Sequence, residues 1–314
     1  MNTQKDTRAM VEAALMVAIT SLFAIASRYI PFLTFVTALI PTPFILLGKR
    51  HGLRYEILSI LAAAFVIGGL TSPIYSLFVV ALPGITAIVM GYMMNKGYTA
   101  QKVWMAGTAA ALVATLLSIN LVSFIMGIDY FQDMFDAMRQ GMDINISLYE
   151  KMGVEGKKIE EVKASIEYMI QFMSMAIPSV IILSSILAAY INLVLSTYVL
   201  NRIGYAVEKL PSLKHFRLPK SIIMGTFIII LLTIATSYLK IVHSETLVVN
   251  VVLLLQMIYF FQGIAVVHYF MTAYNLRKFV RILIWILIFT TPNFAFIVTM
   301  LGFVDAVIDL RRLK

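Results

Sequence analysis

The chain has 314 residues, of which 61% are hydrophobic and 13% are charged, and its net charge is +9. About a quarter of the residues of an ordinary soluble domain are charged, so this composition excludes a soluble globular protein and indicates many membrane spans. The sequence lacks cysteine and its histidines are scattered, which predicts neither a metal site nor a cofactor. The net positive charge is expected on cytoplasmic loops and not at a nucleic acid, because no solvated basic domain is left over.

Apolar runs between charged or turn-rich breaks predict eight helical membrane spans. They are expected at about 9–27, 32–48, 57–70, 74–94, 103–127, 168–199, 222–239 and 246–274. Pro41 and Pro43 interrupt the second span, and Pro83 lies within the fourth. The first run imitates a signal peptide, but Glu12 inside it favours a retained helix and an ion pair with Arg8.

The last apolar run, residues 282–303, has two interpretations. It is long enough for a ninth crossing, but Thr290-Thr291-Pro292-Asn293 can break the helix, since proline removes a backbone donor. We favour two half-helices folded back, with a cytoplasmic C-terminus, and we expect Asp305 and Asp309 at a solvated or self-paired helix end. The predicted fold class is therefore all-α, a polytopic transmembrane helical bundle of about eight spans plus a broken C-terminal hairpin, with nine spans as the alternative.

The distribution of basic residues predicts the orientation. With a cytoplasmic N-terminus, fifteen lysines and arginines lie inside, and outside there are two, Arg28 and Lys240, apart from the insertion discussed next. The positive-inside rule therefore predicts a multi-pass protein of the cell membrane with its N-terminus in the cytoplasm.

One long polar insertion, residues 128–167, separates the fifth and sixth spans. It contains nine acidic and five basic residues, while Phe131, Met134, Phe135 and Met138 recur at helical spacing. This pattern predicts an amphipathic helix at the membrane interface. The insertion is either a helical hairpin packed on the bundle mouth or a lid over a pocket.

Three regions are expected along the chain. Residues 1–200 form a six-span membrane unit that includes the insertion at 128–167. Residues 201–220 form a basic cytoplasmic loop with five lysines and arginines, which suits binding to anionic lipid. Residues 221–314 supply the C-terminal membrane helices.

Polar side chains inside spans are costly in lipid and are therefore candidate ligand-binding residues. These candidates are Tyr75, Asn120, Ser123, Asn192 and Gln256. Hydrogen bonding between helices is the alternative interpretation of each of them.

Small residues four apart on the first helix allow close approach of another helix. They are Ala9, Ala13, Ala14 and Ala18, and they predict either a partner interface or ordinary packing within the chain.

Two resemblances follow from these patterns. The first two hundred residues resemble the substrate-binding S-components of energy-coupling-factor vitamin transporters, in the six spans, the alanine pattern and the proline-broken second helix that runs into Gly48-Lys49-Arg50-His51-Gly52. That resemblance implies that the alanine face docks on a membrane coupling subunit. The additional C-terminal helices depart from the S-component pattern. The whole chain is similar to an uncharacterised bacterial membrane-protein family typified by YybS.

The sequence contains no Walker loop, serine elbow, HExxH helix or dinucleotide glycine pattern, so we do not expect an enzyme. The first functional hypothesis is an integral membrane protein that binds or transports a small solute, whose identity the sequence does not reveal. The alternative is a non-transporting membrane scaffold or regulator that holds partner proteins.

Overall fold

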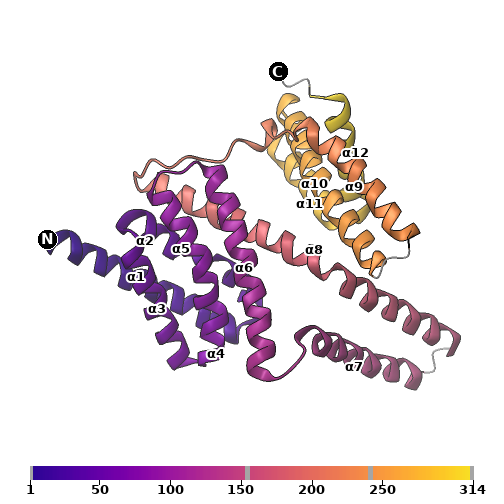
Figure 1. Cartoon of the computed structure of the whole chain (residues 1–314), viewed down its shortest axis with the longest axis horizontal. Helices are drawn as coiled ribbons and strands as arrows, with labels where there is room; N and C mark the ends of the chain where they lie inside the picture. The colour runs from indigo at the N-terminus through magenta and orange to yellow at the C-terminus, as the bar shows by residue number, and fades with distance from the viewer. Residues whose placement is uncertain (1–2, 153–155, 240–242, 312–314) are drawn as a thin grey trace. The chain divides into compact units, whose positions relative to one another are not determined.

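The computed structural model describes residues 3–152, 156–239 and 243–311. Within these ranges the chain is 88% helical and contains no strand, which confirms the all-α prediction (Figure 1). The chain forms two compact units, of which unit 1 comprises Met1–Asn145 and Ile181–Leu210 and unit 2 comprises Ile146–Val180 and Pro211–Lys314. The three predicted regions, with limits at residues 200 and 220, stay a prediction.

Three elements in the first part of the chain begin at prolines. In chain order the first elements, all in unit 1, are α1 (Thr3–Tyr29), the 3₁₀ segment η1 (Pro31–Leu39), α2 (Pro41–His51), α3 (Leu53–Leu70), α4 (Pro73–Ser76), the π segment η2 (Leu77–Ala81), α5 (Leu82–Asn95) and α6 (Ala100–Met126). Those that begin at prolines are η1, α2 and α4. Proline suits the first turn of a helix because the N–H it lacks would have no helical partner there. The second predicted span is accordingly divided into η1 and α2 at Pro41.

The turn between α2 and α3 determines which side chains enter the bundle. Gly52 has a φ of 86°, a left-handed conformation that glycine adopts without a steric penalty. The chain therefore reverses at Gly52, and α3 begins at Leu53, four residues earlier than the predicted start at residue 57. This earlier start places Glu56 inside a membrane helix.

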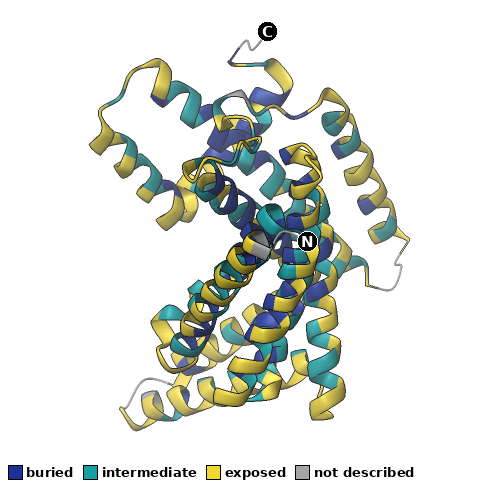
Figure 2. Ribbon diagram, turned by 90° about the vertical axis from the view of Figure 1, so that its left-hand side faces the viewer, coloured by how far each residue is buried: buried dark blue, intermediate teal, exposed yellow. Residues whose placement is uncertain are grey.

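The core of unit 1 lies where α2, α3 and α5 pack together. Phe44, Ile45, Ala63, Ile67 and Met90 are fully buried there. Many large apolar side chains on the outer faces of the helices are exposed (Figure 2). This apolar exterior is what a lipid-facing surface requires.

The insertion and the remaining helices follow α6. They are α7 (Tyr130–Lys151), α8 (Gly156–Arg202), the 3₁₀ turn η3 (Leu213–His215), α9 (Lys220–Tyr238), α10 (Ser244–Ala273), α11 (Lys278–Thr290) and α12 (Pro292–Ile308). The predicted amphipathic helix in the insertion is confirmed as α7, with Phe135 buried and Gln132 and Asp133 exposed. Whether the insertion packs as a hairpin or closes over a pocket stays a prediction.

Helix α8 contains Pro178, and a side chain from α10 forms hydrogen bonds with backbone groups of α8 beside this proline. The Asn250 amide group donates to the Met175 carbonyl oxygen at 2.7 Å and accepts from the Ser179 backbone N–H at 2.7 Å. The amide thus takes the place of an i to i−4 hydrogen bond of α8. Neighbouring helices commonly satisfy backbone groups that proline frees within a membrane.

Helices α10 and α12 approach each other more closely than side chains would allow. A Cβ added to Gly263 of α10 would collide with the Val298 carbonyl oxygen, and one added to Gly302 of α12 would collide with the Tyr259 carbonyl oxygen. Glycine at these two positions lets the two backbones touch, as in other tightly packed membrane helices.

Among the residues that the structure describes, eight helical segments are long and apolar enough to span a membrane, and α11 and α12 form a further pair bent by 101°. The bend falls at Thr291, whose backbone is extended, with Pro292 beginning α12. The predicted eight spans and broken C-terminal pair are therefore confirmed.

The contacts of the chain after α12 indicate that the bent pair returns to the side from which it starts. Helices α9 and α10 pack as a hairpin, with the Thr226 and Tyr259 hydroxyls 2.8 Å apart. After α12, Arg311 donates to the carbonyl oxygens of Lys214 and Phe216, which precede α9. The start of α9, the end of α10 and the end of α12 therefore share one side.

Cysteine labelling should reproduce this arrangement, and the chain offers a cysteine-free background. Single-cysteine variants Ser212→Cys and Leu310→Cys are expected to react with an impermeant maleimide from the same side of the membrane. Glu245→Cys, at the start of α10, is expected to react from the opposite side. Leu310→Cys reacting together with Glu245→Cys would establish a ninth crossing and contradict the bent pair.

Candidate functional site

A charged cluster joins α1 to the end of α2 in unit 1. The Glu12 carboxylate accepts from Arg8 at 3.1 Å, from Arg50 at 2.8 Å and lies 2.6 Å from the His51 Nε2 atom. The predicted pairing of Glu12 with Arg8 is confirmed. Arg50 and His51 complete the cluster, so this carboxylate has its full set of partners and holds α1 against the turn after α2.

A second carboxylate, that of Glu56, has the opposite environment. Its side chain is 0% exposed, and neither carboxylate oxygen has a hydrogen-bond partner among the described residues. It lies beside Gly48 of α2 and Gly91 of α5, where an added Cβ would collide with the carboxylate. A partnerless carboxylate is costly to bury in protein or lipid, which makes such a residue a candidate for function.

Glu56 is not alone in lacking a partner. In the described ranges, the buried side-chain atoms without a hydrogen bond all belong to unit 1. They are Thr20 Oγ1, Ser21 Oγ, Arg50 Nε, both Glu56 oxygens, Ser196 Oγ and Thr197 Oγ1. Unit 1 therefore contains polar groups that its own packing does not use.

Two of the predicted ligand-binding residues are engaged in contacts within unit 1. The Tyr75 hydroxyl donates to the Ala24 carbonyl oxygen at 2.7 Å and lies 3.0 Å from the Ser27 hydroxyl. Asn192 is buried, accepts from the Thr42 hydroxyl at 2.8 Å and donates to the Ala38 carbonyl oxygen at 2.9 Å. Both residues join helices.

Of the other three predicted ligand-binding residues, Asn120 and Gln256 are exposed and Ser123 is half-buried. Asn120 donates to the Leu116 carbonyl oxygen of its own helix, and the Ser123 hydroxyl accepts from the Tyr130 N–H. Gln256 is exposed on α10 and belongs to unit 2. None of the hydrogen bonds described for the five candidates joins one to another, and their ligand-binding role stays a prediction.

The four alanines of α1 divide between two environments. Ala9 is buried and Ala13 is half-buried, while Ala14 and Ala18 are exposed. The first pair therefore packs within unit 1, and the second pair lies on the outer surface of α1. The partner role of all four stays a prediction.

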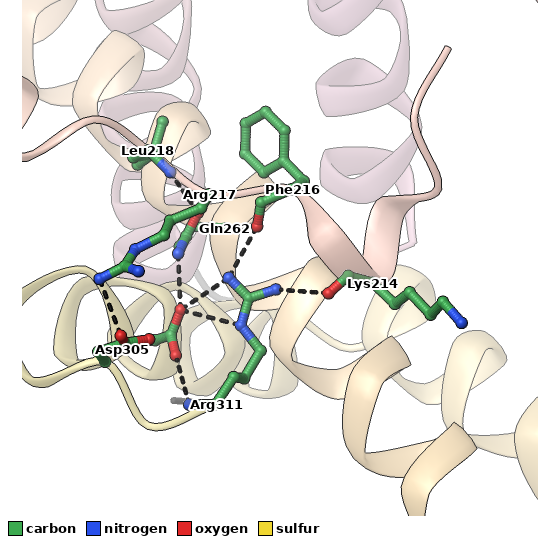
Figure 3. Close-up of polar contacts among 8 residues, drawn as sticks. Lys214, Phe216, Arg217, Leu218, Gln262, Asp305 and Arg311 are labelled. Atoms are coloured by element: carbon green, nitrogen blue, oxygen red, sulfur yellow. Dashed lines mark hydrogen bonds and ion pairs between the residues drawn. The ribbon is translucent and has the colours of Figure 1, made fainter. Parts of the chain in front are cut away.

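Unit 2 contains a fully paired ionic cluster at the end of α12 (Figure 3). The Asp305 and Arg311 side chains are 1% and 0% exposed, and Arg311 Nη2 lies 2.9 Å from Asp305 Oδ2. Gln262 donates to the same carboxylate at 2.6 Å and accepts from the Leu218 N–H at 3.1 Å. Asp305 is buried and paired, so of the two expected alternatives the structure shows the self-paired helix end.

These contacts assign the Asp305 cluster a structural role. Arg311 also donates to the Lys214 and Phe216 carbonyl oxygens, so its charge has both an anionic partner and backbone acceptors. The cluster fastens the chain after α12 to α10 and to the segment before α9. Since its described groups are satisfied, it leaves little capacity to bind a further ligand.

Sequence reasoning missed Glu56 because the third span was placed too late. Glu56 shares one helical face with Ile60, Ala63 and Ile67, which follow at spacings of four, three and four residues and are all buried. Continuing the helical spacing of these apolar residues by one turn toward the N-terminus would have identified Glu56 as an acid on the buried face of α3.

Comparisons with known proteins agree with this architecture. Residues 18–306 match a family model described as a predicted membrane protein, DUF2232. The chain is similar to the uncharacterised protein YybS of Bacillus subtilis (strain 168), with 21% identity over 98% of this chain and 99% of that protein. No solved structure matches the chain. The resemblance to transporter S-components stays a prediction. Because the family model covers most of its length and nearly all of its membrane helices, the chain belongs to the DUF2232 family of predicted membrane proteins.

Proposed function

We propose that this integral membrane protein binds or transports a small solute through unit 1. The observation that carries the proposal is the restriction of unpartnered buried polar atoms to unit 1 among the described residues. Groups that only stabilise a bundle are paired, as they are around Asp305 in unit 2. Unpaired polar groups cost stability in an apolar interior, and binding a polar ligand would offset that cost.

The proposal includes no catalytic step and no cofactor. It places the N-terminus in the cytoplasm of a cell-membrane protein, in accordance with the distribution of lysine and arginine. A membrane coupling subunit, which the S-component resemblance implies, is the proposed helical partner.

A matched pair of serines on α8 tests solute binding. Ser196 and Ser185 are 0% and 2% exposed, but the Ser196 hydroxyl lacks a partner while Ser185 donates to the Ile181 carbonyl oxygen. The purified protein in lipid nanodiscs would be screened by thermal shift against vitamins, amino acids, nucleosides and sugars, and by native mass spectrometry for co-purified molecules.

For any compound that binds, Ser196→Ala should weaken binding about fivefold to tenfold, the value of one hydrogen bond. Ser185→Ala should leave binding unchanged, because its hydroxyl is already engaged. The proposal fails if no compound binds under either method, or if the two variants behave alike.

A scaffold is the second candidate function, and the exposed face of α1 favours it. Ala14 and Ala18 are exposed beside Val11, Leu15 and Leu22, which gives a small-residue surface with apolar edges. Ala14→Trp would block close helix approach on this face. Loss of a crosslinked partner from the Ala14→Trp variant, with solute binding unchanged, would favour the scaffold. Anionic lipid at the basic loop of residues 201–220 is compatible with either function.

A further inference from the structure

The Glu56 carboxylate is enclosed on two sides by glycine. Gly48 of α2 and Gly91 of α5 face it, and a Cβ on Gly91 would lie 2.8 Å from the Glu56 Cδ atom as well as colliding with one oxygen. The side chain is completely buried. The space beside the carboxylate is therefore too small for a methyl group, and it does not admit an organic solute.

The basic side chains at the end of α2 are engaged with partners other than Glu56. On α2, Arg50 and His51 bind Glu12, and Lys49 donates to the Met94 carbonyl oxygen at 2.7 Å.

Several described ionisable groups on α1 and α3, and Lys96 just after α5, contact other partners or are exposed. The Tyr55 hydroxyl donates to Asp6 at 3.0 Å, Arg54 is exposed, and Lys96 lies over the Tyr92 ring. Arg8 and Glu12 of α1 bind each other. No described ion pair or hydrogen bond therefore provides Glu56 with a counter-charge.

We propose that Glu56 is a proton-binding site in unit 1, which holds H⁺ as a neutral carboxyl group and can exchange it with water. A buried carboxyl group without a partner stays neutral, because its ionised form would lose the solvation of water without gaining an ion pair or a hydrogen bond. A proton is also a ligand small enough for the space between Gly48 and Gly91. Intramembrane acids of this kind form proton relays in pumps and transporters.

Proton binding adds a second ligand to unit 1 and is independent of solute binding. The use of the proton to drive solute movement, by contrast, rests on the proposed transport function. In such a coupled cycle the Glu56 O–H bond forms when a proton enters from one side of the membrane and breaks when the proton leaves, with no change in oxidation state.

Difference infrared spectroscopy of the full chain in nanodiscs, recorded over a pH series, tests the site directly. The C=O stretch of a protonated carboxyl group should be present at neutral pH in the wild-type protein and lost in Glu56→Gln. Glu12→Gln is the matched control, since Glu12 is a paired carboxylate in the same unit, and it should retain the band. The proposal is overturned if the band is missing from the wild type or survives in Glu56→Gln.

A second variant keeps the test decisive if Glu56→Gln does not fold. Glu56→Asp retains the acid but moves it away from Gly48 and Gly91, so the band should persist at a shifted frequency. An unshifted band would belong to another carboxyl group and would overturn the assignment.

The solute screen separates the two proposals. Loss of the infrared band in Glu56→Gln without any solute hit would retain the proton site and reject the transport function. A solute that binds, together with an infrared band unaffected by Glu56→Gln, would support the proposed solute function and reject the proton site. Where both are positive, Glu56→Gln should abolish solute accumulation driven by a pH gradient in proteoliposomes while solute exchange continues.

Discussion

Replacing Asp305 with asparagine is expected to lower the free energy of unfolding by about 3–5 kcal/mol, the cost of leaving one member of a buried ion pair without its partner. The asparagine side chain fits the same space and can still accept from Gln262. The Arg311 charge, however, would remain buried without an anion. Thermal and denaturant unfolding of the purified protein in detergent would measure the loss.

Asp309→Asn is the matched control for this prediction. Asp309 pairs with Arg217 at 2.9 Å, but the two side chains are 30% and 35% exposed, so its loss should cost within about 1 kcal/mol. Asparagine also tolerates the left-handed conformation of Asp309, whose φ is 56°. Adding Arg311→Met to Asp305→Asn should recover part of the lost stability, because it removes the unpaired charge. Equal losses in the two asparagine variants would contradict a buried, energetically important pair.

Gly263→Ala is expected to cost about 1–3 kcal/mol, because the new methyl group meets the Val298 carbonyl oxygen of α12, and a close-packed core resists such additions. Backbone atoms cannot move aside as the end of a flexible side chain can. Truncating the neighbour by Val298→Ala should therefore fail to rescue the variant. Unfolding of the purified protein is again the measurement.

The control for this substitution lies on α9. A Cβ added to Gly225 meets nothing within 4 Å, so Gly225→Ala should be neutral or stabilising by up to about 1 kcal/mol from helix propensity. If Gly263→Ala and Gly225→Ala have the same effect, α10 and α12 do not pack through their backbones.

Local patterns were sufficient to predict the helices and most of their breaks. Long apolar runs and the prolines at residues 41 and 292 act through nearby residues, so the divided second span and the bent C-terminal pair could be read from the sequence. The start of α3 could not be placed as well, because the polar residues Arg54, Tyr55 and Glu56 separate Leu53 from the apolar run that begins at Ile57. That error of one helical turn concealed Glu56.

The polar contacts depend on packing between distant segments, and local patterns do not contain that information. Asn250 inserts into the backbone ladder of α8 from 71 residues away, and Arg311 reaches the carbonyl oxygen of Lys214 across 97 residues. Asn192 could be identified from the sequence as a polar residue inside a span. Its hydrogen bond with Thr42 could not be predicted, because it depends on how α2 packs against α8. A polar side chain within lipid can be recognised from sequence, whereas its partner depends on the fold.

The bend between α11 and α12 has a consequence for the surrounding solvent. At 1.5 Å per residue the 13 residues of α11 extend about 20 Å, well into a hydrocarbon layer of about 30 Å. Every helix end leaves carbonyl and N–H groups without helical partners, and Pro292 and Asn293 at this tip are exposed. Acyl chains cannot hydrogen-bond such groups, so the tip requires a hydrated vestibule or a neighbouring polypeptide at that depth.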